Sequence, residues 1–169
     1  MQQLRSYDDG MTEPFRTRRM VEFADTDMAG IAHFSVFYRW MESAEHELVR
    51  SVGLSIFSPF PEGSRPGEED VAISFPRVHA SCDFKSPVRC EDVVDIDVSL
   101  ERLGTKSISY AFAFSKAGEA VASGRVTCVC CRVPPGGPVE SVPVPEAVAA
   151  ALRPHVVSSE GANEGASGQ

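Results

Sequence analysis

Hydrophobic side chains recur at two different spacings along this chain, and the change of spacing separates one helix from a set of strands. Between His33 and Val52 the apolar positions return every three or four residues, which is the period of an amphipathic α-helix. Gly53 follows at the place where a glycine commonly ends a helix. The residues on the predicted apolar face are Phe34, Phe37, Met41, Ala44, Leu48 and Val52.

Alternation of apolar and polar residues predicts strands on both sides of this helix. Residues 18–24 alternate before it, and four longer segments follow it. Short turns separate these later segments, so we expect antiparallel neighbours in a meander. Pro76 lies inside the first of them and indicates a bulge or an edge position. The four predicted strands cover residues 71–84, 93–103, 106–115 and 120–133.

The order of these elements predicts an α+β fold. An amphipathic helix and a sheet with one apolar face must bury those surfaces against each other, so one long helix packs on a curved antiparallel sheet. We expect one domain at residues 16–153, preceded by a flexible arm at 1–15 and followed by a disordered tail at 154–169. Residues 55–70 are rich in Pro, Gly, Ser and acids and predict a long loop of the kind that often forms a lid. A short helix is expected near residues 145–152.

Composition narrows the functional classes. The chain has 169 residues and a net charge of −8, which argues against nucleic acid, since that partner needs clustered Lys and Arg. No apolar run is long enough for a membrane span or a secretory signal, so we expect a cytoplasmic protein without a membrane partner. The cysteines are odd in number, and Cys128, Cys130 and Cys131 cluster in one predicted strand, which favours buried, reduced thiols. Cys128 and Cys130 could also bind zinc, but they lack a second ligand pair at suitable spacing, so neither metal nor cofactor is expected.

The segment DTDMAGIAHF, residues 25–34, carries the candidate chemistry. Asp27 stands three residues before Gly30 and about six before the predicted helix. The first N–H groups of a helix have no partner within it and carry a partial positive charge, so they can stabilise an oxyanion. A carboxylate just upstream could act as a general base or a nucleophile. Asp also commonly forms N-caps and turns, so this structural role for Asp27 stays open, and we expect Asp25 to bond the turn backbone.

At these residues the sequence resembles the 4-hydroxybenzoyl-CoA thioesterase family, within the hotdog-fold acyl-CoA thioesterases. The similarity extends over about residues 17–133. It includes the segment Gly104-Thr105-Lys106-Ser107, which is similar to a characteristic turn of that family, and the strand segment AVASGRVT. The family pattern at the acidic segment corresponds to Phe23, Asp25, Asp27, Gly30, Phe37, Arg39, Trp40 and Glu42.

The resemblance implies a hotdog fold, in which the sheet wraps around one central helix, and an acyl-CoA thioesterase that forms a homodimer or homotetramer. It implies that Asp27 is the catalytic carboxylate and that the backbone N–H of Phe34 faces the thioester carbonyl. Gly30, His33 and Phe37 would complete the oxyanion and substrate site. Lys106 and Ser107 would lie near the CoA phosphates, which could be those bound by the partner subunit.

Several alternatives stay open at this point. His33 could be a second acid–base group, as a hydratase or dehydratase of enoyl thioesters would need, or it could cap the helix. The chain could also bind acyl-CoA without turnover, or it could act on acyl carrier protein thioesters. Many family members carry Asn where Val36 stands here, and many carry His or Tyr where Phe34 stands, so we expect a more apolar acyl pocket.

Overall fold

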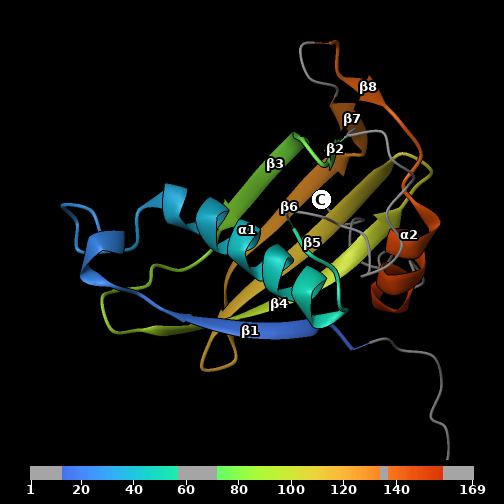
Figure 1. Cartoon of the computed structure of the whole chain (residues 1–169). Helices are drawn as coiled ribbons and strands as arrows, with labels where there is room; N and C mark the ends of the chain where they lie inside the picture. Colours follow the sequence, from blue (N-terminus) through green and yellow to red (C-terminus); the bar gives the residue numbers. More distant parts are fainter. Residues whose placement is uncertain (1–12, 57–71, 134–136, 158–169) are drawn as a thin grey trace, which may run out of the picture.

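A five-stranded antiparallel sheet and one long helix, α1 (Phe34–Ser51), form the main body of the protein, with α1 lying across one face of the sheet (Figure 1). The computed structural model describes residues 13–56, 72–133 and 137–157. The strand order of the sheet is β1-β4-β5-β6-β3. Most of the expected arm, tail and 55–70 loop lies outside the described residues. The main strands are β1 (Phe15–Met20), β3 (Arg77–Phe84), β4 (Val93–Leu103), β5 (Ser107–Lys116) and β6 (Glu119–Val129).

Shorter elements surround this sheet. A second sheet has three strands in the order β2-β7-β8, and a short helix, α2, follows it in the chain. As predicted, α2 lies close to residues 145–152, and its Val148 and Leu152 are buried. No helix within the described residues has the length and apolarity that crossing a bilayer requires. The remaining elements are η1 (Phe23–Asp25), β2 (Ala72–Ser74), β7 (Cys131–Val133), β8 (Glu140–Ser141), α2 (Glu146–Leu152) and η2 (Arg153–His155).

The core lies between α1 and the sheet. Strand β4 has the predicted bounds, and every second residue of it, from Val94 to Leu100, is fully buried. Gly53 has φ +79° directly after the helix, which confirms the predicted helix end. Phe34 was predicted to join the buried face, but this residue of the first helical turn is 59% exposed. The buried face of α1 consists of Val36, Phe37, Trp40, Met41, Ala44, Glu45 and Leu48.

One close approach between α1 and the sheet depends on a glycine. A Cβ atom added to Gly124 of β6 would overlap the Met41 sulfur, and it would lie 3.2 Å from the backbone oxygen of Ser81. The absence of a side chain at Gly124 therefore leaves the space that Met41 occupies in the core.

Three predicted strands have different limits in the structure. The first ends at Met20 rather than Ala24, because the chain turns there and residues 23–25 form η1. The segment 71–84 divides at Pro76, which has no N–H for a sheet. The segment 120–133 divides at Cys130, whose N–H donates to the Lys106 carbonyl at 2.8 Å instead of continuing β6.

Candidate active site at the start of the long helix

Backbone hydrogen bonds close the acidic turn into a compact loop ahead of α1. The Asp27 N–H donates to the Ile31 carbonyl at 2.9 Å, and the Gly30 N–H donates back to the Asp27 carbonyl at 2.9 Å. Gly30 has φ +70°, a conformation that side chains with a Cβ rarely adopt. The His33 N–H then donates to the Asp25 carbonyl at 2.8 Å, which fixes the loop to the first residues of the helix. Gly30 thus serves the loop geometry.

The Asp27 side chain is exposed and takes part in the turn. Its Oδ1 accepts a hydrogen bond from the Ala29 N–H at 2.8 Å, which is an Asx-turn. The other oxygen, Oδ2, has no hydrogen-bond partner among the described residues. The structural role left open for Asp27 is therefore present, and it leaves one carboxylate oxygen available for a ligand.

Asp25 has the structural position that the sequence predicts. One oxygen of its carboxylate accepts the Glu22 N–H at 3.0 Å, and the other lies 3.4 Å from the Arg39 guanidinium. These contacts join the turn to the second helical turn of α1. Asp25 is thus engaged on both oxygens, in contrast to Asp27.

One amide in the first turn of α1 has no hydrogen-bond partner among the described residues. His33 is the N-cap residue, and its Nδ1 lies 2.8 Å from the Ser35 hydroxyl and 3.4 Å from the Ser35 amide nitrogen. The Val36 N–H donates to the His33 carbonyl at 2.9 Å. No hydrogen bond in the described part of the chain uses the Phe34 N–H. That group is therefore free to donate at the positive end of the helix dipole.

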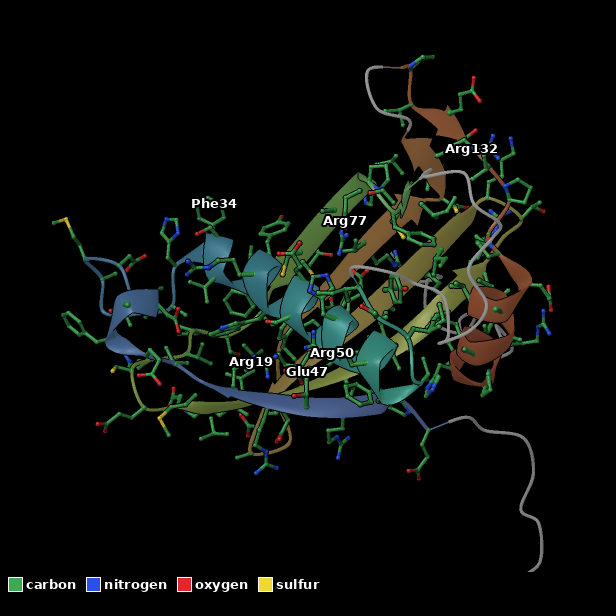
Figure 2. All side chains as sticks on the ribbon, viewed as in Figure 1. Arg19, Phe34, Glu47, Arg50, Arg77 and Arg132 are labelled. Atoms are coloured by element: carbon green, nitrogen blue, oxygen red, sulfur yellow. The ribbon has the colours of Figure 1, made fainter. Side chains whose placement is uncertain are left out.

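A groove of about 490 Å³ connects the Asp27 side chain to this end of the helix. Figure 2 shows Phe34 at the N-terminal end of α1. Phe37 is 3% exposed, and its ring packs edge-on against Phe84 with centroids 5.1 Å apart. The walls of the groove are mostly apolar, with Lys85 and Ser86 among the polar exceptions. The residues that line it are Asp27, Ile31, Ala32, Phe34, Phe37, Phe84, Lys85, Ser86, Pro87 and Val88.

The second wall of this groove was missed by the sequence analysis. It comes from the end of β3 and the segment after it, residues 84–88, where the sequence indicated only a strand end and a turn. The Ala32 N–H donates to the Val88 carbonyl at 2.8 Å, which holds this wall against the acidic loop. The sequence did not indicate this wall, because most of α1 and strands β2 and β3 separate the two walls along the chain.

Lys106 and Ser107 lie away from this groove in the single chain. Met20, just before the acidic turn, pairs with Val93 at the start of β4, whereas Lys106 follows the end of that 11-residue strand. At about 3.3 Å per residue, the two ends of β4 are roughly 30 Å apart. The Lys106 ammonium donates to the Ser141 carbonyl at 3.0 Å, so its own chain provides a partner for it. One copy of the chain therefore does not bring Lys106 to Asp27.

The clustered cysteines occupy the interior. Cys128, Cys130 and Cys131 are buried free thiols, as the sequence predicts. Burial raises the pKa of Cys128 to about 12 and that of Cys130 to about 11, so both stay protonated and unreactive near neutral pH. Within residues 13–56, 72–133 and 137–157, no group of His, Cys, Asp or Glu side chains is placed to hold a metal ion.

Comparison with known proteins decides the family. Residues 21–152, which include every element from the acidic loop to α2, match the family described as the thioesterase-like superfamily. The chain belongs to the thioesterase-like superfamily. The resemblance found in the sequence and the predicted hotdog fold are thereby confirmed.

Several known proteins align with much of the chain. A 1,4-dihydroxy-2-naphthoyl-CoA hydrolase from Prochlorococcus marinus (strain MIT 9313) is 36% identical over 57% of this chain. The chain spans 64% of that relative, a little under two thirds of its length. The enzyme of the same name from Synechococcus sp. (strain RCC307) is 33% identical over 65% of this chain and 81% of its own length. The structure of a gentisyl-coenzyme A thioesterase is 32% identical, with a TM-score of 0.65 over 82% of this chain and 99% of that chain.

Proposed function

We propose that this protein is an acyl-CoA thioesterase and that hydrolysis takes place in the groove between Asp27 and the start of α1. The observation that supports the proposal is that Asp27 and Phe34 line one groove and that each has a group without a hydrogen-bond partner among the described residues. Asp27 Oδ2 is an acceptor without a partner, and the Phe34 N–H is a donor without a partner among the described residues. Thioester hydrolysis needs a base or nucleophile and an oxyanion donor, and these two groups meet that need.

In the proposed reaction the thioester carbonyl oxygen accepts a hydrogen bond from the Phe34 N–H. The helix dipole, roughly half a positive charge at this end, adds to the stabilisation of the negative oxygen that forms. Asp27 either removes a proton from the attacking water or attacks the carbonyl carbon itself, in which case water hydrolyses the resulting anhydride. In both routes the C–S bond breaks, the CoA sulfur takes up a proton, and the acid is released.

The lining of the groove favours an aromatic acyl group. Three phenylalanine rings, those of Phe34, Phe37 and Phe84, contribute to it, and aromatic groups gain from edge-to-face contacts beyond the area they bury. Relatives named for 1,4-dihydroxy-2-naphthoyl-CoA and gentisyl-coenzyme A are consistent with an aromatic acyl group. The polar groups of the groove come from Asp27, Lys85 and Ser86, so we expect an acyl group with few hydroxyls.

A second copy of the chain would complete the site. Strand β3 pairs only with β6 among the described strands, and its Val78 and Phe84 are 62% and 50% exposed. An open sheet edge with large exposed apolar residues favours association with another chain. In such a dimer, Lys106 and Ser107 of one subunit would bind the phosphates of a CoA whose thioester lies beside Asp27 of the other.

The test is release of free thiol from a panel of aromatic, short-chain, medium-chain and long-chain acyl-CoAs, with acyl carrier protein thioesters as a further arm. We expect turnover on aromatic acyl-CoAs. Binding of acyl-CoA without thiol release would instead support a non-catalytic binding module. Loss of enoyl-CoA absorbance without thiol release would indicate hydration, which has less support because the His33 ring faces Ser35 and no carboxylate bonds to it among the described residues.

A further inference from the structure

A second cavity, of about 310 Å³, lies beside the C-terminal half of α1. It is bounded by α1, the short strand β2, strand β5 and helix α2. Arg77 lines it at one end of β3, whereas Phe84 lines the Asp27 groove at the other end. Those two residues are about 23 Å apart at 3.3 Å per residue, so the cavity is separate from the proposed active site.

Most of the cavity wall is apolar. The residues Val49, Leu54, Ile73, Ile108, Val148 and Leu152 contribute to it. An apolar cavity of about 150 Å³ in another protein is large enough to bind benzene. A molecule with two fused aromatic rings, or an aliphatic body of similar size, therefore fits this larger space.

One side of the cavity carries a buried polar cluster. Glu45 is 4% exposed, and its Oε2 accepts a hydrogen bond from Arg77 Nη2 at 2.8 Å. Figure 2 shows Arg77 beside α1, the helix that carries Glu45. Arg77 also lies 3.9 Å from the exposed Glu42. Burial raises the pKa of Glu45 to about 7 even though Arg77 opposes the shift.

Two groups of this cluster have unused hydrogen-bonding capacity. Tyr110 is 2% exposed, yet no hydrogen bond within the described residues uses its hydroxyl. Glu45 Oε1 is likewise without a hydrogen-bond donor in the described residues. Burial raises the pKa of Tyr110, and the negative charge of Glu45 adds to the effect. Glu45 and Tyr110 both line the cavity, so their unused hydrogen-bonding capacity is available to a ligand there.

We propose that this cavity binds a neutral, compact apolar molecule that carries a hydroxyl group, such as a phenol or an alcohol. The ligand hydroxyl donates to Glu45 Oε1 and accepts from the Tyr110 hydroxyl, and the apolar body lies between α1, β2 and α2. An anionic ligand is disfavoured, because Glu42 and Glu45 place two carboxylates beside the single guanidinium of Arg77. The remaining ionisable neighbour on the lining is His46, whose pKa is lowered mainly by burial and which is therefore neutral at pH 7.

The test is the equilibrium binding of 2-naphthol, measured by isothermal titration calorimetry in the absence of acyl-CoA. We expect a saturable component of one molecule per chain that depends on this cavity, beside any binding in the Asp27 groove. Tyr110→Phe, which removes only the hydroxyl, should lower the affinity for 2-naphthol about 3- to 10-fold, the usual effect of losing one neutral hydrogen bond. The same variant should leave 2-methylnaphthalene unaffected. The wild-type protein should bind 2-naphthoate more weakly than 2-naphthol.

A filling variant and a control at the other site make the result decisive. Ile73→Trp, on a short strand at the cavity wall, should abolish 2-naphthol binding. Asp27→Asn should bind 2-naphthol as tightly as the wild type, because Asp27 lies in the other groove. The proposal is overturned if 2-naphthol does not bind, or if neither Tyr110→Phe nor Ile73→Trp changes its affinity. Since no thioester is present, a failure here is independent of any failure of the proposed hydrolysis.

Discussion

The Ala29 N–H donates a hydrogen bond to Asp27 Oδ1 at 2.8 Å, so the side chain proposed for catalysis is also part of the turn that presents it. A structural and a catalytic role for Asp27 are therefore compatible, because they use different oxygens of one carboxylate. Phe34 lines the same groove as Asp27, and separate substitutions distinguish the contribution of the Asp27 carboxylate from that of the Phe34 N–H.

Asp27→Asn should abolish most thioester hydrolysis while keeping the turn. The asparagine carbonyl oxygen can still accept the Ala29 N–H, but the amide can act neither as a base nor as a nucleophile. We expect kcat to fall by on the order of 10²–10⁴, measured by release of free thiol. The melting temperature should stay close to that of the wild type. A variant with wild-type kcat would remove Asp27 from the mechanism.

Two variants at Phe34 separate its backbone from its ring. Phe34 is the first residue of α1, a position that accepts proline, and the extended backbone of His33 suits a following proline. Phe34→Pro removes both the N–H and the ring, whereas Phe34→Ala removes only the ring. We expect kcat of Phe34→Pro to be about 10²- to 10³-fold below that of Phe34→Ala, the scale of one oxyanion donor. Equal kcat values for the two variants would contradict the oxyanion assignment.

Lys106→Ala should weaken the binding only of substrates that carry the CoA phosphates. Loss of a charge-assisted phosphate contact should raise KM for an aromatic acyl-CoA about 10-fold and leave kcat unchanged. The matched probe is the same acyl group on N-acetylcysteamine, which has no phosphate, and its KM should not change. If KM rises equally for both substrates, Lys106 does not bind the CoA phosphates. Its effect on KM would then be structural, for example through its hydrogen bond to the Ser141 carbonyl.

Glu45 should make the protein less stable as the pH rises. Its pKa in the folded state, about 7, is above the ordinary value of 4.5, so the folded state binds this proton more tightly than the unfolded state does. Stability is therefore lost between pH 4.5 and pH 7, by about 3 kcal/mol in total from this group. In Glu45→Gln that share of the pH dependence should be absent when urea unfolding is measured at pH 5 and pH 8.

Glu47→Gln is the matched control for this measurement. Burial raises the pKa of Glu47, but hydrogen bonds from Thr17 and Arg19 outweigh it and bring the pKa below its usual value. Glu47 therefore contributes stability above its unfolded pKa that is lost as the pH falls, which is the opposite sign. The same pH trend in both variants would contradict the assignment to Glu45.

Gly124→Ala should destabilise the contact between α1 and β6. The new methyl group overlaps the Met41 sulfur and crowds the Ser81 carbonyl, and overpacking of this kind costs about 1–3 kcal/mol. Met41→Ala removes the overlapping side chain, so the double variant should be more stable than the sum of the two single effects predicts. Strict additivity in urea unfolding would show that the Met41 contact is not the cause.

The parts of the fold that follow local rules were predictable. Strand β4 has the predicted limits because one of its faces lies on the core, so its alternation is complete from Val94 to Leu100. The first strand was misplaced because Val21 is buried after β1 has ended, and its N–H bonds to the Asp92 carbonyl in a loop. Because Val21 is buried, the apolar and polar residues continue to alternate past Met20, although the chain already turns there.

The sites depended more on contacts between distant segments. The loop 25–30 was recognisable because its backbone hydrogen bonds are local, whereas the groove wall at residues 84–88 has no pattern that points to Phe34. Glu45 was missed because a glutamate on an amphipathic helix is normally exposed, and its partner Arg77 is distant in sequence. The roles of Asp27, Phe34 and Lys106 in the reaction stay predictions.

The self-contained bonding of the acidic loop has a consequence for how this scaffold can change. Bonds among residues 22–33 hold the carboxylate and the end of the helix in register, and the opposite wall contributes to them only through the Val88 carbonyl. Side chains such as Ile31, Phe84 and Lys85 can therefore be exchanged without moving the reacting groups. Single substitutions at these positions can therefore change the acyl-group preference. A mutant library restricted to the three positions is a direct way to obtain such variants.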